Sequence, residues 1–138
     1  MTGQDIIRQL GLEAHPEGGW YRQTWAADNG PRPTGTCIYF LLQAGERSHW
    51  HNVDADEIWL YHAGAPLTLR LAETEAGPAQ SLVLGPDLAA DQRPQRIVPA
   101  GYWQAAATTG DWTLVSCTVS PGFQFEGFEL APPGFDIP

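Results

Sequence analysis

Residues 48–59 (SHWHNVDADEIW) hold two of the four histidines of the chain and three carboxylates. Side chains two positions apart on a strand point to one face, so a strand here would place His49 and His51 side by side. We expect a turn over Asn52–Asp56 and then an antiparallel return strand that brings Glu57 next to the two histidines. Two imidazoles and a carboxylate can bind iron, manganese, nickel or zinc, or can carry out acid–base chemistry.

Further candidate site residues lie in the neighbouring segments. Trp59 and Tyr61 share the strand face of Glu57, and we expect them to offer flat surfaces on which a ring-shaped ligand can stack. Tyr39, in the apolar run TCIYFLL, could supply a phenol as a general acid. Arg47 could pair with Glu57 or hold an anionic group of a ligand.

The charge balance excludes several classes of function. Seven arginines, no lysine and sixteen acidic residues give a net charge of −9. A nucleic-acid partner is not expected, because neutralising phosphates requires a basic face. The absence of lysine excludes Schiff-base catalysis and a phosphate-binding loop of the lysine type.

No run of about 18 apolar residues is present, and the N-terminus lacks the pattern of a secretory signal. We therefore expect no membrane partner and a cytoplasmic location. The two cysteines, Cys37 and Cys117, lie in apolar runs typical of buried thiols.

The length of 138 residues predicts a single domain spanning 1–138. In the first segment, residues 1–14, a short helix is expected from Thr2 to Gly11, with Thr2 and Asp5 as its capping pair. The last segment, residues 131–138, contains three prolines and should be an extended tail.

The rest of the chain has the pattern of an all-β protein, with short Trp-, Tyr-, Thr-, Val- and Leu-rich runs separated by Gly, Pro, Asn and Asp. Nine short strands in a small domain predict a closed barrel or a double-sheet jelly roll, since both limit exposed sheet edges. The expected strands are Trp20–Trp25, Thr36–Leu42, Ser48–Asn52, Glu57–Ala63, Leu67–Ala72, Ser81–Leu84, Arg96–Val98, Trp103–Thr108 and Trp112–Val119.

Two segments outside these strands also attract attention. His15-Pro16-Glu17-Gly18-Gly19 has paired glycines after a charged residue, which predicts a backbone that closely approaches a pocket rim or a partner subunit. Phe123, Phe125 and Phe128 are expected to form an aromatic patch that covers the barrel or a dimer interface.

The spacing Gly45-x3-His49-x-His51-x5-Glu57-x6-Gly64 resembles the first motif of the cupin superfamily. The cupin barrel holds a metal or a substrate between two sheets. Pro99-Ala100-Gly101, followed by Tyr102, Trp103 and Gln104, resembles the second cupin motif.

The resemblance is closer to one branch, the cupin-5 family, a domain of unknown function. It implies a cupin jelly-roll barrel that binds a small-molecule ligand and is usually a homodimer. The blocks that carry it are HPEGGWY (15–21), TCIYFLL (36–42), SHWHNVDADEIW (48–59), GAPL (64–67), LGPDL (84–88), VPAGYWQAA (98–106) and CTVSPGFQFEGFEL (117–130).

Three functions are compatible with this resemblance. The first is a metal-independent isomerase or epimerase, similar to sugar-nucleotide epimerases of the superfamily. In that reading His51 or His49 is the base, Glu57 the orienting carboxylate, and Tyr39 or Tyr61 the acid.

The second is a metal-dependent oxygenase or lyase, with His49, His51 and Glu57 as ligands and Gln104 or water completing the shell. Gln104 stands where metal-binding cupins have a histidine, and Glu57 follows His51 by more residues than in the common pattern. Both departures weaken the expected metal affinity. The third is a non-catalytic module that binds or senses a small ligand.

Overall fold

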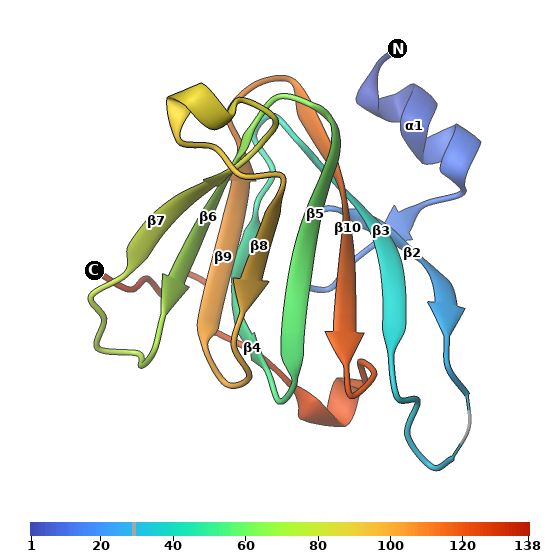
Figure 1. The fold of residues 1–138 in the computed structure, drawn as a ribbon, viewed down its shortest axis with the longest axis vertical. Helices are drawn as coiled ribbons and strands as arrows, with labels where there is room; N and C mark the ends of the chain where they lie inside the picture. Colours follow the sequence, from blue (N-terminus) through green and yellow to red (C-terminus); the bar gives the residue numbers. More distant parts are fainter. Residues whose placement is uncertain (29) are drawn as a thin grey trace.

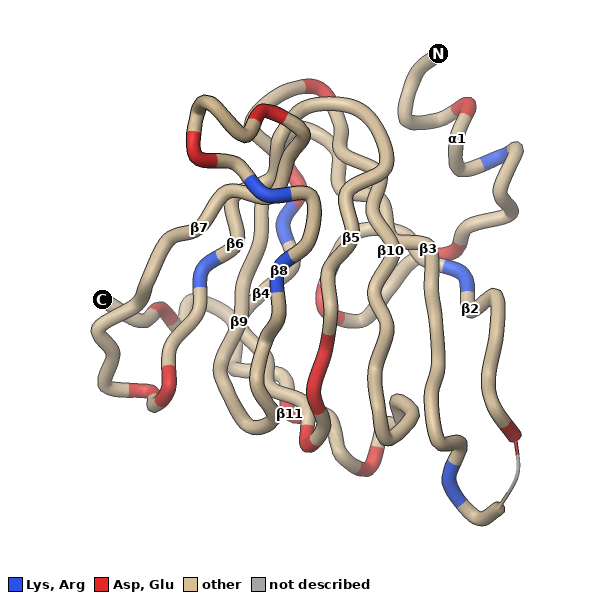
Figure 2. Tube along the Cα trace, in the orientation of Figure 1, with Lys and Arg blue, Asp and Glu red and all other residues tan. Residues whose placement is uncertain are grey.

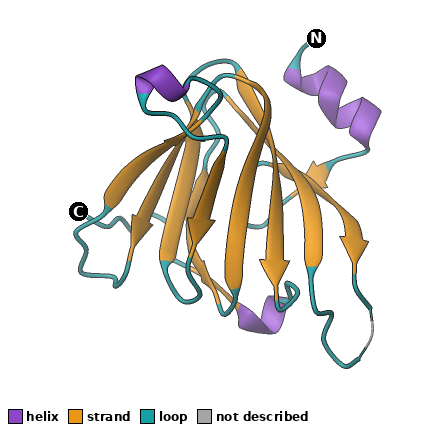
Figure 3. Cartoon of the chain, in the orientation of Figure 1, coloured by secondary structure: helices purple, strands orange, loops and turns teal. Residues whose placement is uncertain are grey.

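The computed structural model describes residues 1–28 and 30–138, which form two antiparallel sheets packed face to face (Figures 1 and 3). The prediction of an all-β jelly roll with one short N-terminal helix is therefore confirmed. In chain order the elements are α1 (Gly3–Leu10), β1 (Glu13–Ala14), β2 (Trp20–Ala26), β3 (Thr36–Gln43), β4 (Ser48–Val53), β5 (Asp56–Gly64), β6 (Leu67–Ala72), β7 (Gln80–Leu84), the 3-10 turn η1 (Leu88–Ala90), β8 (Gln95–Val98), β9 (Trp103–Thr108), β10 (Trp112–Ser120), the 3-10 turn η2 (Phe125–Gly127) and β11 (Phe128–Leu130).

The strands are divided between a six-stranded sheet, ordered β1-β2-β3-β10-β5-β8, and a five-stranded sheet, ordered β11-β4-β9-β6-β7. All nine expected strands form, and their bounds agree to within one residue at either end. The sequence reading missed β1 and β11, which have only two and three residues and lie at sheet edges.

The strands β4 and β5 differ from expectation, because they do not pair with each other. Strand β4 belongs to the five-stranded sheet and β5 to the six-stranded sheet. The chain between Val53 and Asp56 thus crosses from one sheet to the other. Glu57 consequently faces β4 across the barrel interior instead of lying beside it within one sheet, as the sequence had suggested.

Helix α1 forms where the capping pattern predicted it. The Thr2 hydroxyl accepts a hydrogen bond from the Asp5 backbone, and the Asp5 carboxylate accepts one from the Thr2 backbone. Gly11 ends the helix in the left-handed region, at φ 66°, which glycine adopts without steric cost. Ile6 packs with Leu12 and Leu41 on the outer face of the six-stranded sheet. No helix among the described residues is long and apolar enough to cross a membrane.

The C-terminal tail packs on the outer face of the five-stranded sheet of its own chain. Ile137 is completely buried, in one cluster with Trp50, Trp103 and Ala131. The Trp50 indole N–H also donates to the Asp136 carboxylate at 2.9 Å. These contacts explain why a proline-rich segment is ordered.

The main core lies between the sheets, and it is apolar along most of its length. Burying such side chains contributes about 1.5–3 kcal/mol each. The largest members of this cluster are Phe40, Leu42, Trp59, Leu67, Leu69, Leu71, Leu84, Val98 and Val115.

Candidate functional site

A cavity of about 230 Å³ opens between the two sheets, at the end of the barrel where β4 ends and β5 begins. Polar and apolar side chains both contribute to its wall. The lining residues are His15, Glu17, Tyr21, Gln23, Thr36, Ile38, His51, Val53, Glu57, Cys117, Val119, Phe123 and Phe125.

His51 projects from β4 into this cavity and is almost completely buried. Its Nδ1 lies 2.7 Å from the carbonyl oxygen of His49. Because a carbonyl oxygen can only accept, Nδ1 carries the ring proton and donates a hydrogen bond to that oxygen. The neutral ring then leaves its Nε2 lone pair free, and Nε2 lies 3.6 Å from Oε2 of Glu17. In this tautomer, Nε2 of His51 can accept a proton and act as a base.

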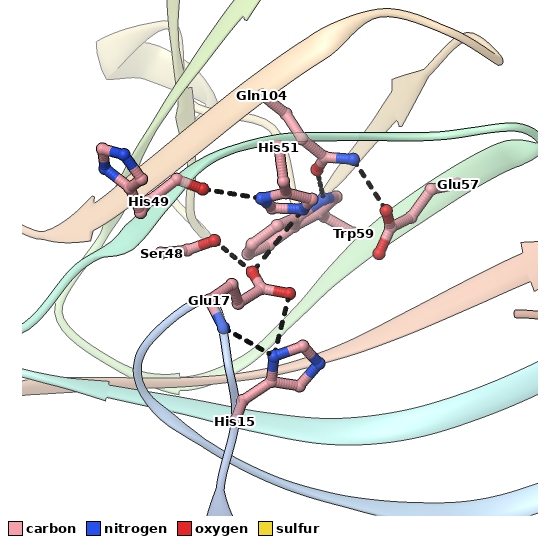
Figure 4. Close-up of polar contacts among 8 residues, drawn as sticks. All are labelled: His15, Glu17, Ser48, His49, His51, Glu57, Trp59 and Gln104. Atoms are coloured by element: carbon pink, nitrogen blue, oxygen red, sulfur yellow. Dashed lines mark hydrogen bonds and ion pairs between the residues drawn. The ribbon is translucent and has the colours of Figure 1, made fainter. Parts of the chain in front are cut away.

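His49 points away from the cavity, which corrects the expectation that both histidines share one face (Figure 4). Ser48 lies opposite Ala106 of β9 whereas His51 lies opposite Gln104, so three residues of β4 span two of β9. This bulge breaks the alternation of side chains. The Nε2 atom of His49 lies 2.9 Å from the Pro132 carbonyl of the tail.

Glu17 enters the cavity from the loop between β1 and β2. The backbone N–H of His49 donates to the Glu17 carbonyl at 2.8 Å, which fixes this loop to β4. Gly18 follows with φ 109°, and a Cβ there would lie 2.0 Å from the Arg47 carbonyl oxygen. Only glycine permits this approach. The carboxyl group of Glu17 also accepts a hydrogen bond from the Ser48 hydroxyl.

His15 stands beside Glu17 in the same loop. The backbone N–H of Glu17 donates to His15 Nδ1 at 3.1 Å, so this nitrogen is unprotonated in the neutral ring. The Glu17 Oε1 atom lies 3.3 Å from the same nitrogen. The ring packs edge-on against Tyr21, with centroids 4.5 Å apart. The loop residues predicted to approach a pocket rim therefore supply two of its polar groups.

Glu57 faces the cavity from β5 and is held by Gln104 of β9. The Gln104 side-chain N–H donates to Glu57 Oε1 at 2.8 Å, and the Gln104 oxygen accepts the Trp59 indole N–H at 2.9 Å (Figure 4). Because an indole N–H can only donate, this chain of bonds fixes the orientation of the amide. Gln104 is a positioning residue for Glu57.

Burial dominates the electrostatics of these groups. It raises the pKa of Glu17 to about 8, against the lowering effect of the Ser48 hydrogen bond. It raises the pKa of Glu57 to about 7, although the nearby His51 and the Gln104 bond lower it. Burial also lowers the pKa of His15 to about 4 and that of His51 below its ordinary value. At pH 7 the cavity therefore holds two neutral imidazoles and a Glu17 that is mostly protonated.

Four other residues predicted for the site lie elsewhere. Trp59 is packed in the core beneath the cavity, and the Tyr61 hydroxyl donates to the Gly64 carbonyl. Tyr39 packs with the helix cluster on the outer face, because it alternates with Phe40, which points inward. Arg47 is exposed beside a separate cavity of about 110 Å³ that His49 also lines.

Other cavity residues were missed by the sequence reading. Cys117 is buried in the wall, where burial raises the pKa of its thiol well above the ordinary value. The strand alternation of β10 around Val115, Cys117 and Val119 could have identified it. Phe123 and Phe125 line the mouth, in agreement with the expectation that an aromatic patch covers the barrel.

The metal ligands expected from the sequence do not form one group. His49 points away from the cavity, and the only oxygen on the side chain of Gln104 is bonded to Trp59. Across residues 1–28 and 30–138, no three or more His, Cys, Asp or Glu side chains are grouped so that they could hold a metal ion. The predicted ligand set therefore does not fit a metal.

Comparison with solved structures identifies similar barrels. A protein from Shewanella oneidensis is 43% identical, with a TM-score of 0.90, over 95% of this chain and 85% of that chain. A hypothetical protein from Leishmania major is 28% identical, with a TM-score of 0.89, over 98% of this chain and 90% of that one.

Oxalate decarboxylase from Bacillus subtilis is more distant, at 12% identity and a TM-score of 0.65, over 85% of this chain and 29% of that enzyme. That likeness concerns the fold alone. No curated protein matches the chain. The family model described as Cupin superfamily (DUF985) matches residues 4–131, and the chain therefore belongs to this cupin family.

Proposed function

We propose that this cupin is a metal-independent acid–base enzyme, of the isomerase or epimerase type, that acts on a small carbonyl compound. One observation carries the proposal: the unprotonated Nε2 of His51 lies 3.6 Å from Oε2 of Glu17 inside a buried cavity. A base and a carboxylic acid at this spacing can serve neighbouring atoms of one substrate.

In the proposed reaction, His51 Nε2 removes a proton from the carbon next to the substrate carbonyl. The electrons of the C–H bond form a C=C bond, and the carbonyl oxygen takes the proton of the Glu17 carboxylic acid. When the deprotonated carbon carries a hydroxyl group, the intermediate is an enediol. His51 then returns its proton to the former carbonyl carbon, while the hydroxyl group on the deprotonated carbon gives its proton to Glu17 and becomes the new carbonyl. Every proton is restored, so the isomerisation needs no further reactant.

Glu57 supports this reaction from the opposite sheet. Its negative form stabilises the imidazolium that His51 becomes, since the two groups interact electrostatically. Its protonated form can deliver a proton to the opposite face of the enol, which would give epimerisation. In this assignment Glu17 takes the acid role that the sequence reading gave to Tyr39 or Tyr61.

The cavity also narrows the substrate class. Its volume of about 230 Å³ lies below the range of about 300–1,000 Å³ of pockets for drug-sized ligands. No arginine is among the residues that line it, so a phosphate would find no countercharge there. These features favour a small sugar or hydroxycarbonyl compound over a sugar nucleotide. They also give no support to the metal-dependent alternative, whose ligands do not meet.

Hydrogen exchange in D₂O tests the proposal without knowledge of the product. Hydroxyacetone, dihydroxyacetone, glyceraldehyde and aminoacetone would each be incubated with the protein at pD 7.4. Loss of the signal from the hydrogens next to the carbonyl would be followed by proton NMR. We expect exchange with at least one compound, and a loss of about 10²–10⁴-fold in His51→Gln and Glu17→Gln.

The matched control is His62→Gln, because His62 is exposed on the outer face and bonds to Ser116. It should retain the wild-type rate, and EDTA should leave that rate unchanged. Exchange that EDTA abolishes would contradict the metal-independent mechanism. Absence of exchange with every compound would contradict catalysis and favour a non-catalytic binding module.

A further inference from the structure

The charge of the cavity wall indicates a ligand class more specific than a small carbonyl compound. Two carboxyl groups, from Glu17 and Glu57, face this space, and neither forms an ion pair with an arginine. Among the described residues, the polar side chains that contact them are neutral: the Ser48 hydroxyl, the Gln104 amide, the Cys117 thiol and imidazoles held neutral by burial. The cavity therefore contains acid groups without a resident cation.

None of the seven arginines is among the residues that line the cavity. Figure 2 marks the arginine positions along the trace in blue. Arg32 bonds beside the cavity mouth, next to the lining residue Phe123. It bonds to both oxygens of Asp54 at 2.7 and 3.1 Å and to the Gly122 carbonyl at 2.8 Å. Its donors are thus directed at the protein. An anionic ligand entering the cavity would meet carboxyl groups with no positive charge in compensation.

Part of the cavity wall is aromatic. Phe123 and Phe125 lie with ring centroids 5.1 Å apart at the mouth, and the ring of Phe128 packs edge to face against Phe123 with centroids 5.7 Å apart. Tyr21 adds a further ring to the lining. Phe125 is 55% exposed, an unusual position for a large apolar ring, so part of its face is free to contact a ligand.

We propose that the natural ligand of the cavity is a compact organic cation, a protonated amine whose nitrogen lies between Glu17 and Glu57 and whose carbon frame contacts the aromatic wall. A positive charge between the two carboxyl groups lowers their pKa, so an ammonium group favours their ionised forms, which compensate its charge. Aromatic faces attract cations and pack against the carbon atoms of the ligand. For the reaction proposed above, the substrate would then be a small aminocarbonyl compound. This assignment uses the cavity of the proposed function, but it rests on the charge of the wall and does not require turnover.

Three compounds with one ring and different charges test this inference: benzylamine, benzyl alcohol and benzoate. Binding to the full chain would be measured by isothermal titration calorimetry and ligand-observed NMR at pH 7.5. We expect benzylamine to bind at least tenfold more tightly than benzyl alcohol, and benzoate not to bind at 10 mM. Equal or tighter binding of the alcohol or of benzoate would overturn the proposal, as would absence of binding by all three.

Substitutions at Glu57 and Phe125 test whether these residues cause the preference for an amine. Glu57→Gln should reduce the preference for benzylamine over benzyl alcohol at least fivefold, and Phe125→Ala should weaken the binding of both compounds. Glu73→Gln, a change of the same type at an exposed position outside the cavity, should leave the preference unchanged. An unchanged preference in a folded Glu57→Gln protein would also overturn the proposal. Selective amine binding without hydrogen exchange would reject the proposed enzyme activity and leave this inference intact.

Discussion

The two ends of the barrel interior are built by the same strands but differ in chemistry. On β3, Thr36 and Ile38 face the cavity, whereas Phe40 and Leu42 fill the packed end. On β5 the cavity receives Glu57 and the core receives Trp59. The change of character occurs within two residues. One sheet pair thus supports a dry core that stabilises the fold and an open end that can hold ionisable groups.

Polar side chains at the open end are held by hydrogen bonds instead of by close packing. No buried side-chain nitrogen or oxygen among the described residues lacks a hydrogen-bond partner. Gln104 marks the boundary between the two ends, since it joins Trp59 of the core to Glu57 of the cavity. The packed core therefore supplies most of the free energy of folding. The cavity sets the protonation states of Glu17, Glu57 and the imidazoles, and with them the charge of the ligand that can bind.

Substitutions in the packed end of the barrel should cause the largest loss of stability. Leu69 is fully buried there, so Leu69→Ala should lower the free energy of unfolding by about 2–5 kcal/mol. Val119→Ala is the comparison, because Val119 packs with Val53 but also borders the cavity, so its truncation enlarges a space that is already open. Urea denaturation measures both. A loss at Val119 as large as that at Leu69 would contradict the division into two ends.

The boundary residue should give the next largest effect. Gln104→Leu keeps the approximate size of the side chain but leaves the Trp59 indole N–H without an acceptor. Leaving one such buried donor without a partner costs about 1–3 kcal/mol. The pKa of Glu57 should also rise, since the bond from Gln104 lowers it. Urea denaturation and NMR titration of the Glu57 carboxyl carbon check the two results, and a variant as stable as wild type would refute the first.

A smaller effect is expected from pH. The pKa of Glu17 rises from 4.5 to about 8 on folding, so the folded protein binds this proton more tightly and loses stability as the pH rises toward 8. The pKa of His15 falls from 6.5 to about 4, which has the opposite effect between pH 4 and 6.5. Stability should therefore fall between about pH 6.5 and 8, where the carboxyl group dominates. Thermal unfolding across this range measures it.

The matched variant for this pH effect is Glu17→Gln, which removes the titrating group and keeps hydrogen-bonding capacity. It should flatten the decline in melting temperature above pH 6.5. A decline of the same size in this variant would assign the effect to another group, of which Glu57 is the first candidate because its pKa is raised to about 7.

Much of the fold could be predicted from sequence because its signals are local. The capping pair at Thr2 and Asp5 gave the helix, and alternation with turn residues gave nine strands close to their observed bounds. The short strands β1 and β11 could not be predicted, since two or three residues carry no periodic pattern and pair only through tertiary contacts. His51 and Glu57 line one cavity, but from opposite sheets and not from neighbouring strands as expected.

The errors in the site arose from long-range geometry. A bulge in β4 turned His49 outward, and no residue type in SHWH indicates where a strand will bulge. The carboxyl group of Glu17 reaches His51 across 34 positions of sequence, and only the paired glycines pointed to that loop. The amide oxygen of Gln104 could in principle bind a metal. Its role is visible only in the structure, where that oxygen accepts a hydrogen bond from the Trp59 indole.

The smallest effect is expected at His49, and it distinguishes the two faces of a single strand. His49→Gln removes an imidazole whose hydrogen bond within the described part of the chain goes to the Pro132 carbonyl, and the glutamine amide can donate the same bond. We expect a change in unfolding free energy of less than about 1 kcal/mol and hydrogen exchange within twofold of wild type. His51→Gln, two residues away, should lower that exchange by about 10²–10⁴-fold. Equal losses in the two variants would place both imidazoles at the reacting atoms and would reject the bulged arrangement of β4 as the one that functions.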